Sequence, residues 1–186
     1  MAGYTILLVD DEAPILKALT RVLQHEGYLL RATTSPTEAV ELLRGEEIHL
    51  VISDHTMPGM TGLEVLRMAR LLRPDTVRVI LTGNADLSMA LQAINQGEIY
   101  RFLTKPWDNN ELLLTVRLGL QEYEIRKQNR RLTAVVRQQA ETLRRLRGRP
   151  GESAPRAPLP AVAPTGTGVF TISEEELAEL EQESGI

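Results

Sequence analysis

Short apolar runs alternate with stretches of helical period along the first 120 residues of the chain. The runs are mainly apolar, and residues 5–9 are apolar on both faces, as expected for a central parallel strand covered by helices on either side. They predict strands over residues 5–9, 28–32, 50–54, 77–81 and 100–104. The stretches between them repeat apolar residues at helical spacing, which predicts helices over residues 14–26, 36–45, 62–72 and 87–95 and from residue 109 onward.

Polar residues mark where three of these helices begin. In each case a capping residue is followed three positions later by a glutamate, and such a pair can satisfy the free backbone N–H groups of the first helical turn. The pairs are Ser35 and Glu38, Thr61 and Glu64, and Asp108 and Glu111. Glycine or proline stands at the end of each of the first four helices, where it stops helix growth.

Five strands that alternate with five helices predict an α/β fold with a doubly wound parallel sheet. Right-handed crossovers place helices on both faces of such a sheet. For a flavodoxin-like five-stranded sheet we expect the strand order 2-1-3-4-5. In that order the carboxyl ends of the first and third strands are neighbours, and ligand chemistry in these folds collects at that edge.

Polar side chains follow four of the five strands. Asp10 and Asp11 follow the first, Asp54 ends the third, Thr82 follows the fourth and Lys105 follows the fifth. Carboxylates brought together without a counter-charge repel one another, and Mg²⁺ with its preference for carboxylate oxygens and a phosphate oxygen would relieve that repulsion. A lysine and a hydroxyl beside the metal suit a phosphoryl group. The set predicts phosphoryl transfer to a carboxylate, with Asp54 as the central candidate.

Four motifs in the same order resemble the receiver domain of two-component response regulators, the CheY-like family, over residues 4–120. They are Leu-Val-Asp-Asp-Glu at 8–12, Ser-Asp-His-Thr-Met-Pro-Gly at 53–59, Leu-Thr-Gly at 81–83 and Leu-Thr-Lys-Pro-Trp at 103–107. Together they are far more specific than any one of them. The resemblance implies that a histidine kinase or phosphotransfer protein supplies the phosphoryl group and that the chain is a signalling domain, whose only catalysis is its own phosphotransfer and autodephosphorylation.

The resemblance also implies a role for individual residues. Asp54 would be the phosphoacceptor, and Asp10, Asp11, Asp54 and the backbone carbonyl of Thr56 would hold Mg²⁺. Lys105 would contact the phosphoryl oxygens, and Thr82 and Phe102 would form the switch that moves inward on phosphorylation. The family usually has a cis bond before the position of Pro106, and the positions of Thr56 and Asn84 help to set the phosphoryl lifetime.

Each of these residues also has an ordinary structural interpretation. Asp10 or Asp11 alone could cap a helix, Thr82 could simply end a strand, and Lys105 and Phe102 could be a surface lysine and a half-buried aromatic. Only their joint placement at strand ends favours the site. The three histidines, His25, His49 and His55, show no metal-ligand spacing, and we interpret them as surface or structural residues.

The last predicted helix continues past the receiver domain, because no proline interrupts residues 111–147. Heptad position d falls on Leu118, Ile125, Leu132, Gln139 and Leu146, and position a on Glu122, Asn129, Val136 and Leu143. Residues 121–147 therefore favour a dimerising coiled coil, with Asn129 fixing the register, over a solvated helical extension. The surplus of arginine invites a nucleic-acid interpretation, but the absence of a helix-turn-helix pattern or a separate basic region weighs against it.

Two further segments follow the helix. Residues 148–168 are rich in proline, alanine and glycine, which predicts a disordered linker. Residues 169–186 form an acidic tail whose Ser173 and following glutamates predict a short helix and, as a hypothesis, a docking peptide.

Counts of Lys+Arg against Asp+Glu are 11 and 15 for residues 1–120, nine and three for 121–149, one and one for 150–168, and none and six for 169–186. The charge is strongly polarised along the chain.

Composition narrows the class further. The chain has no cysteine, and 42% apolar residues without a long apolar run predict a core but no membrane span. The N-terminus has no signal-peptide pattern, so we expect a cytoplasmic location.

We expect a receiver that signals by dimerisation and contacts with an output protein. The alternatives are a DNA-binding regulator and a metal-dependent phosphohydrolase, although the latter's second aspartate is missing from Asp54-His55-Thr56.

Overall fold

The computed structural model describes residues 3–83, 94–95 and 97–146, and residues 1–143 form one compact unit. That unit is built on a parallel sheet of five strands: β1 (Thr5–Val9), β2 (Leu29–Thr33), β3 (Leu50–Asp54), β4 (Val77–Thr82) and β5 (Arg101–Thr104). The strand order is β2-β1-β3-β4-β5, which confirms the predicted fold class and order. Three strands differ from their predicted bounds by one residue.

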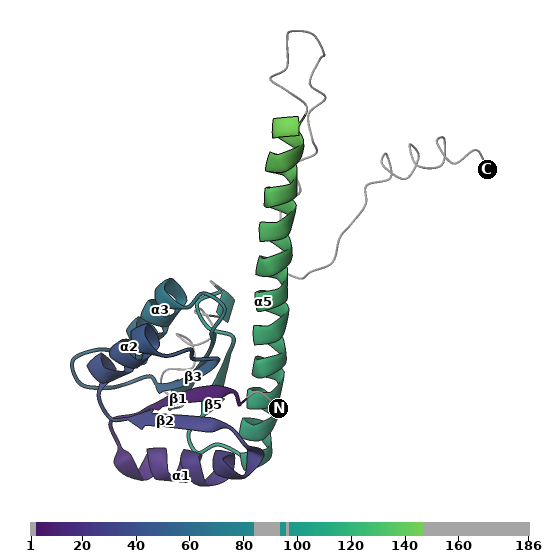
Figure 1. Cartoon of the computed structure of the whole chain (residues 1–186). Coiled ribbons are helices and arrows are strands. Elements are labelled where there is room, and N and C mark those ends of the chain that lie inside the picture. Colours follow the sequence, from purple (N-terminus) through teal and green to yellow (C-terminus); the bar gives the residue numbers. More distant parts are fainter. Residues whose placement is uncertain (1–2, 84–93, 96, 147–186) are drawn as a thin grey trace. The chain divides into compact units, whose positions relative to one another are not determined.

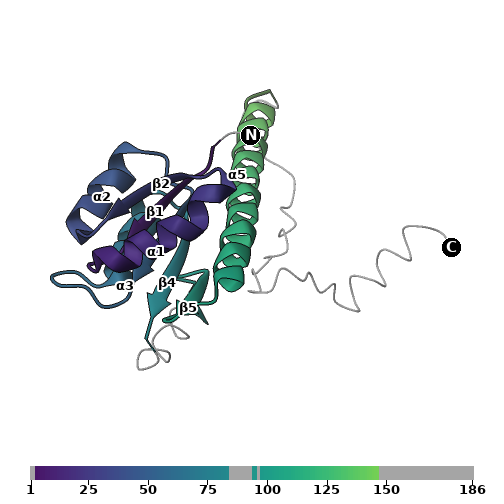
Figure 2. The ribbon, with the colours of Figure 1, turned by 90° about the horizontal axis from the view of Figure 1, so that it is seen from below.

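Helices cover both faces of the sheet (Figures 1 and 2). They are α1 (Ala13–Leu23), extended by a 3₁₀ turn η1 (Gln24–Glu26), α2 (Pro36–Gly45), α3 (Gly62–Leu72) and α5 (Asn109–Leu146). On one face α1 and the start of α5 pack on a core that includes Leu19, Ile52 and Leu112, while α2 and α3 pack on a second core on the other face. Of the helix predicted over residues 87–95, only Ile94 and Asn95 are described, and both are helical.

The predicted caps fix where the helices begin. The Ser35 hydroxyl accepts from the Glu38 amide, and Thr61 and Glu64 form a reciprocal capping box. Asp108 accepts from the backbone amides of residues 110 and 111 at 2.8 and 3.0 Å. Caps of this kind contribute about 1 kcal/mol each. The predicted helix starts are therefore confirmed by the hydrogen bonds that produce them.

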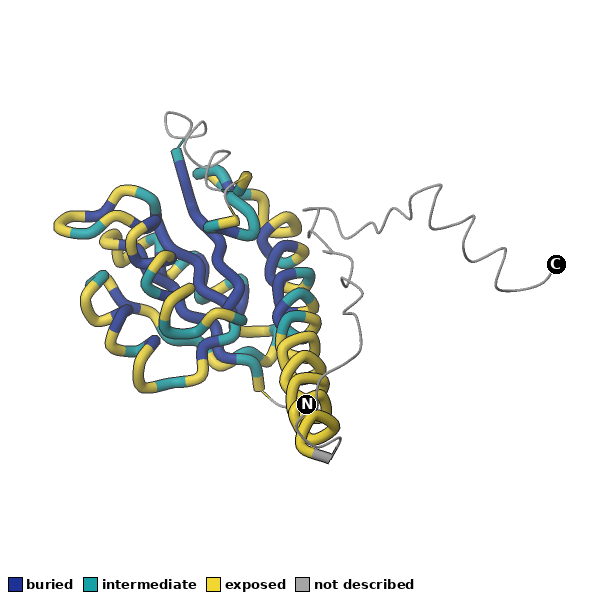
Figure 3. The backbone as a smooth tube through the Cα atoms, turned by 90° about the horizontal axis from the view of Figure 1, so that it is seen from above, coloured by how far each residue is buried: buried dark blue, intermediate teal, exposed yellow. Residues whose placement is uncertain are grey.

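Helix α5 packs on the sheet over its first four turns only. Its large buried apolar side chains recur at helical spacing and are Leu112, Val116, Leu120 and Tyr123. Gly119 allows the close approach, because a Cβ there would lie 2.7 Å from the Leu50 side chain. From Lys127 to Arg145 every residue is exposed (Figure 3). Because most helical stability in proteins comes from the packing of an amphipathic face, we expect the exposed half to be stabilised by contacts beyond its own backbone hydrogen bonds.

Polar contacts hold the middle of α5 at the amino end of the sheet. Tyr123 and Lys127 both donate to Glu47 Oε1, at 2.8 and 3.0 Å, from the hydroxyl and the ammonium group respectively. His49 accepts from the Thr5 amide through Nδ1 at 2.9 Å, and its ring lies edge-on between Tyr4 and Tyr123. We call Tyr4, Glu47, His49, Tyr123 and Lys127 the collar. It gives His49 a structural role in the molecule.

Candidate functional site

Two aspartates and a lysine meet at the carboxyl edge of the sheet. Asp10 follows β1 and is fully buried, while Asp54 ends β3 and is 6% exposed. The Lys105 ammonium, just past β5, lies 2.7 Å from Asp10 Oδ2 and 2.5 Å from Asp54 Oδ1. Strands β1 and β3 are paired neighbours, so the topology itself brings the two carboxylates together. The lysine reaches them from the far edge of the sheet.

The second oxygen of each carboxylate is held by the backbone two residues ahead. Asp10 Oδ1 accepts from the Glu12 amide at 2.9 Å, and Asp54 Oδ2 accepts from the Thr56 amide at 2.7 Å. Aspartate commonly orders the loop after it in this way. Both side chains therefore have a fixed orientation before any ligand binds. In each carboxylate, one oxygen accepts from a loop amide and the other contacts the Lys105 ammonium.

Burial and ion pairing set the charges at this edge. Burial raises the pKa of Asp10 above its ordinary value, while the hydrogen bonds from Lys105 and the Glu12 amide act in the opposite direction. Burial acts to lower the pKa of Lys105, but the hydrogen bonds to Asp10 and Asp54 together with the negative charges of these carboxylates outweigh burial, so this pKa is raised. One ammonium thus serves two buried carboxylates, and the group keeps a surplus of negative charge.

Asp11 stands apart from this pair. Its side chain is exposed and makes no hydrogen bond or ion pair with the residues that the structure describes. Across the described ranges no three histidine, aspartate or glutamate side chains are grouped as a metal site. The oxygen donors are nevertheless of the kind that Mg²⁺ prefers, and the surplus negative charge beside them suits a divalent cation. The ligand set expected from the sequence fits the residues present and stays a prediction.

Thr82 and Phe102, the predicted switch residues, lie on the neighbouring strands β4 and β5. The buried Thr82 hydroxyl donates to the Gly83 carbonyl at 3.1 Å, and its own carbonyl accepts from the Lys105 amide at 2.8 Å. Phe102 is half-buried and packs against the core beneath α2 and α3. The Lys105–Pro106 peptide bond is cis, as expected. Asn84 lies outside the described residues.

Gly62, at the start of α3, is a site residue that the sequence motifs did not single out. A Cβ at this position would lie 1.8 Å from the Asp54 carbonyl oxygen. Its amide donates to the His55 carbonyl at 3.0 Å, which closes the loop that follows Asp54. Only glycine allows α3 to start this close to the end of β3. The signal in the sequence is a glycine directly after the helix-capping Thr61.

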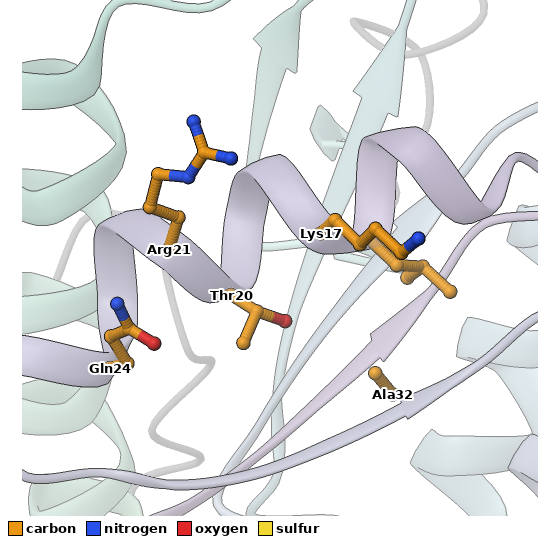
Figure 4. Close-up of a pocket in the computed structure, with 6 residues that line it drawn as sticks. Lys17, Thr20, Arg21, Gln24 and Ala32 are labelled. Carbon is orange, nitrogen blue, oxygen red and sulfur yellow. The ribbon is translucent and has the colours of Figure 1, made fainter.

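A hollow of about 310 Å³ lies elsewhere, between α1 and β2 (Figure 4). Two of its lining residues, Lys17 and Arg21, are exposed cations. The lining residues are Leu16, Lys17, Thr20, Arg21, Gln24 and Ala32. It contains none of the strand-end residues described above. The chemistry at the carboxyl edge therefore does not depend on this hollow.

The residues described include no helix that is long and apolar enough to cross a membrane.

Two transcriptional regulatory proteins are similar to the chain in sequence. It is 37% identical over 124 residues to the hydrogenase transcriptional regulatory protein HoxA of Bradyrhizobium diazoefficiens, and the match covers 67% of this chain and 25% of HoxA. It is 31% identical over 173 residues to the C4-dicarboxylate transport transcriptional regulatory protein DctD of Rhizobium meliloti, and that match covers 93% of this chain and 37% of DctD. The chain thus spans well under half the length of these relatives.

A solved structure and a family model are also similar to the chain. The signal receiver domain of an HD domain-containing protein from Pseudomonas fluorescens Pf-5 is 40% identical, with a TM-score of 0.65, and the match covers 69% of this chain and 94% of that one. Residues 6–117 match the model described as the response regulator receiver domain. The same residues form the sheet and bring Asp10, Asp54 and Lys105 together, and the chain belongs to the response regulator receiver domain family.

Proposed function

We propose that Asp54 accepts a phosphoryl group from the phosphohistidine of a histidine kinase or phosphotransfer protein. The observation that carries this proposal is the position of Lys105 Nζ, between Asp54 Oδ1 and Asp10 Oδ2. An ammonium in that place can follow the negative charge from the carboxylate to an incoming phosphoryl group. Asp54 is also the carboxylate of the pair that keeps some exposure, so a donor can reach it.

The transfer exchanges one bond to phosphorus for another. A carboxylate oxygen of Asp54 attacks the phosphorus, a P–O bond forms, and the P–N bond to the donor imidazole breaks with its electron pair returning to nitrogen. Lys105 shifts its hydrogen bonds toward the phosphoryl oxygens, and the Thr56 amide holds the loop beside them. Asp10, Asp11, Asp54 and the Thr56 carbonyl would hold Mg²⁺, which when bound neutralises charge on the phosphoryl group.

Thr82 and Phe102 would carry the change away from Asp54. The Thr82 hydroxyl is engaged with the Gly83 carbonyl and would exchange that bond for a charge-assisted one to the phosphoryl group. Phe102 is only half-buried and would move inward on the next strand. The two movements form a switch between two states, biased by new phosphoryl contacts.

Dimerisation through α5 is the output that its exposed apolar residues support. Ile125, Leu132, Val136 and Leu143 are between 53% and 62% exposed and occupy a and d positions of the heptads. At about 100° per residue they lie on the side of α5 opposite Val116 and Tyr123, which pack on the sheet. We call these four residues the seam. A second copy could cover the seam without disturbing the receiver core.

Phosphorylation with a small phosphoramidate donor and Mg²⁺ tests the acceptor. We expect intact-mass measurement to show one added phosphoryl group on the wild type and none on Asp54→Ala. Asp75→Ala, a carboxylate on the loop before β4 that is paired with Arg130, is the matched control and should label like the wild type. Equal labelling of the wild type and Asp54→Ala would remove Asp54 from this role.

A second candidate function is DNA binding through α5. It is favoured by the similarity of the chain to transcriptional regulatory proteins and by the arginines of the exposed helix. This function predicts an affinity for duplex DNA that falls steeply with salt. The absence of measurable binding at low salt would exclude it.

A further inference from the structure

The exposed half of α5 has two different faces. One is the seam. At about 100° per residue, the opposite face is formed by arginines. They are Arg131, Arg137, Arg144 and Arg145, all exposed, and we call them the basic face. Because the two faces point in opposite directions, a ligand of the basic face and a second copy on the seam would not compete for the same residues.

The basic face carries charge that the described residues do not neutralise. Nearer the sheet, the cations of α5 are already paired: Arg126 with Glu122, Lys127 with Glu47 and Arg130 with Asp75, at 2.6 to 3.0 Å. Along residues 131–145 the one carboxylate is Glu141, and none of the ion pairs among the described residues joins it to an arginine. Four cations and one anion therefore lie along roughly 20 Å of helix.

The chain contains a segment of matching charge. Residues 173–183 hold six glutamates and no lysine or arginine, with Leu177 and Leu180 among them. Residues 147–172 connect this segment to the end of α5, and a connection of 26 residues can span at most about 90 Å. That is several times the length of the basic face. Tethering also raises the effective concentration of the segment to the order of millimolar. At that concentration several weak, exposed ion pairs are enough to hold the segment on the helix.

We infer that the acidic segment 173–183 binds the basic face of α5 within the same chain. This contact neutralises the arginines and withholds them from other polyanions, while the seam remains available to a second copy. It does not depend on phosphorylation of Asp54. Because all the groups concerned are charged side chains at the surface of the helix or in the tail, the contact is salt-sensitive and exchanges rapidly.

Paramagnetic relaxation in the full-length chain tests this contact. The chain has no cysteine, so Gly185→Cys provides a unique attachment point for a nitroxide label. At low salt, about 50 mM, we expect the label to broaden the backbone amide signals of residues 131–145 and not those of α2. We expect the broadening to disappear at about 500 mM salt. It should also disappear when Glu174, Glu175, Glu176 and Glu179 are all replaced by glutamine.

A matched pair of variants separates the basic face from net charge. Arg131→Gln with Arg137→Gln should reduce the broadening at least twofold, whereas Lys17→Gln with Arg21→Gln, two exposed cations of α1, should leave it unchanged. Broadening that is absent at low salt, that survives high salt, or that is the same in both double variants would overturn the proposal. So would broadening found only between a labelled chain and a separate ¹⁵N chain.

A nucleic acid is the rival ligand of the same arginines. If the segment covers them, the glutamine variant of the tail should bind a random duplex of about 20 base pairs at least tenfold more tightly than the wild type. Equal affinity of the two proteins for the duplex, with loss of binding in the Arg131→Gln and Arg137→Gln variant, would assign the basic face to nucleic acid and overturn the proposal.

Discussion

The carbonyl oxygen of Asp54 occupies the space that a side chain at Gly62 would need, 1.8 Å from the position of its Cβ. The start of α3 is therefore in van der Waals contact with the end of β3, at the residue that we propose as phosphoacceptor. The loop between them is closed by the hydrogen bond from the Gly62 amide to the His55 carbonyl. Any side chain at position 62 must displace either the helix or the Asp54 backbone.

Gly62→Ala is expected to lower both stability and phosphorylation. Overpacking of this kind costs about 1–3 kcal/mol, and here the obstructing atom is backbone, so the larger value applies. Urea unfolding measures the free energy, and labelling by the phosphoramidate donor measures the site. Gly45→Ala, in α2, is the matched control, because a Cβ there meets nothing within 4 Å. It should be neutral or slightly stabilising, and similar losses in both variants would contradict the steric argument.

Lys105→Met removes the ammonium that contacts both buried carboxylates. We expect a loss of up to about 3 kcal/mol near pH 7, because two buried charges lose their partner. The variant should also accept phosphoryl groups poorly. Urea unfolding and donor labelling check the two effects separately, and a variant with unchanged stability would show that the lysine contributes little to the buried pair.

The pH dependence of this variant follows from Asp10. Its pKa in the folded chain is raised above 3.8, chiefly by burial. The folded state therefore holds the proton more strongly than the unfolded state does. As a result, the free energy of unfolding falls as pH rises from the pKa of the unfolded state to that of the folded state. The Lys105 hydrogen bond lowers this pKa. Lys105→Met should therefore extend the fall to higher pH. Adding Asp10→Asn should abolish that extra pH dependence, and an unchanged profile would exclude Asp10 as its source.

Leu132→Glu tests the seam. A carboxylate at a d position would be buried against its counterpart in a second copy, so we expect the dimer to dissociate while the receiver unit unfolds at the same urea concentration. Sedimentation velocity gives the assembly state. Ala134→Glu adds the same charge on the opposite side of α5 and should leave the dimer intact. If the wild type is a monomer at all accessible concentrations, with or without phosphodonor, the seam has another role.

The sheet and its polar edge could be predicted because both depend on local patterns. Strands β1 and β3 are mainly apolar runs that lead directly to Asp10 and Asp54, so the pairing of these two strands brings the two carboxylates together. The position of Lys105 at this edge also follows from strand order, whereas its contact with both carboxylates does not, because β4 separates β5 from β3. The separation of Asp11 does not follow from it either, because adjacent residues in a loop can point in different directions, and only the Asp10 carboxylate is tied to the Glu12 amide.

Contacts between distant segments escaped the sequence interpretation for a related reason. Arg78 lies in the buried strand β4, and its guanidinium donates to the carbonyls of Thr76, Gly97 and Glu98, which an apolar pattern cannot reveal. Burial lowers its pKa to about 10, so it remains charged. The collar likewise joins residues more than 70 positions apart. The predicted linker 148–168 and acidic tail 169–186 lie outside the described residues.

His49 gives the collar a dependence on pH. Burial lowers the pKa of this imidazole below 6.5, so the folded state disfavours its protonation. The stability that the neutral imidazole contributes is therefore present above pH 6.5 and is lost as pH falls through the pKa of the folded state. The geometry agrees, because a proton on Nδ1 would face the Thr5 amide hydrogen. Between pH 7 and pH 5 we expect urea unfolding of the wild type to show a loss on the order of 1 kcal/mol. His49→Gln, which keeps an acceptor for the amide but does not titrate, should show a smaller loss, and parallel profiles for the two proteins would assign the pH dependence to other groups.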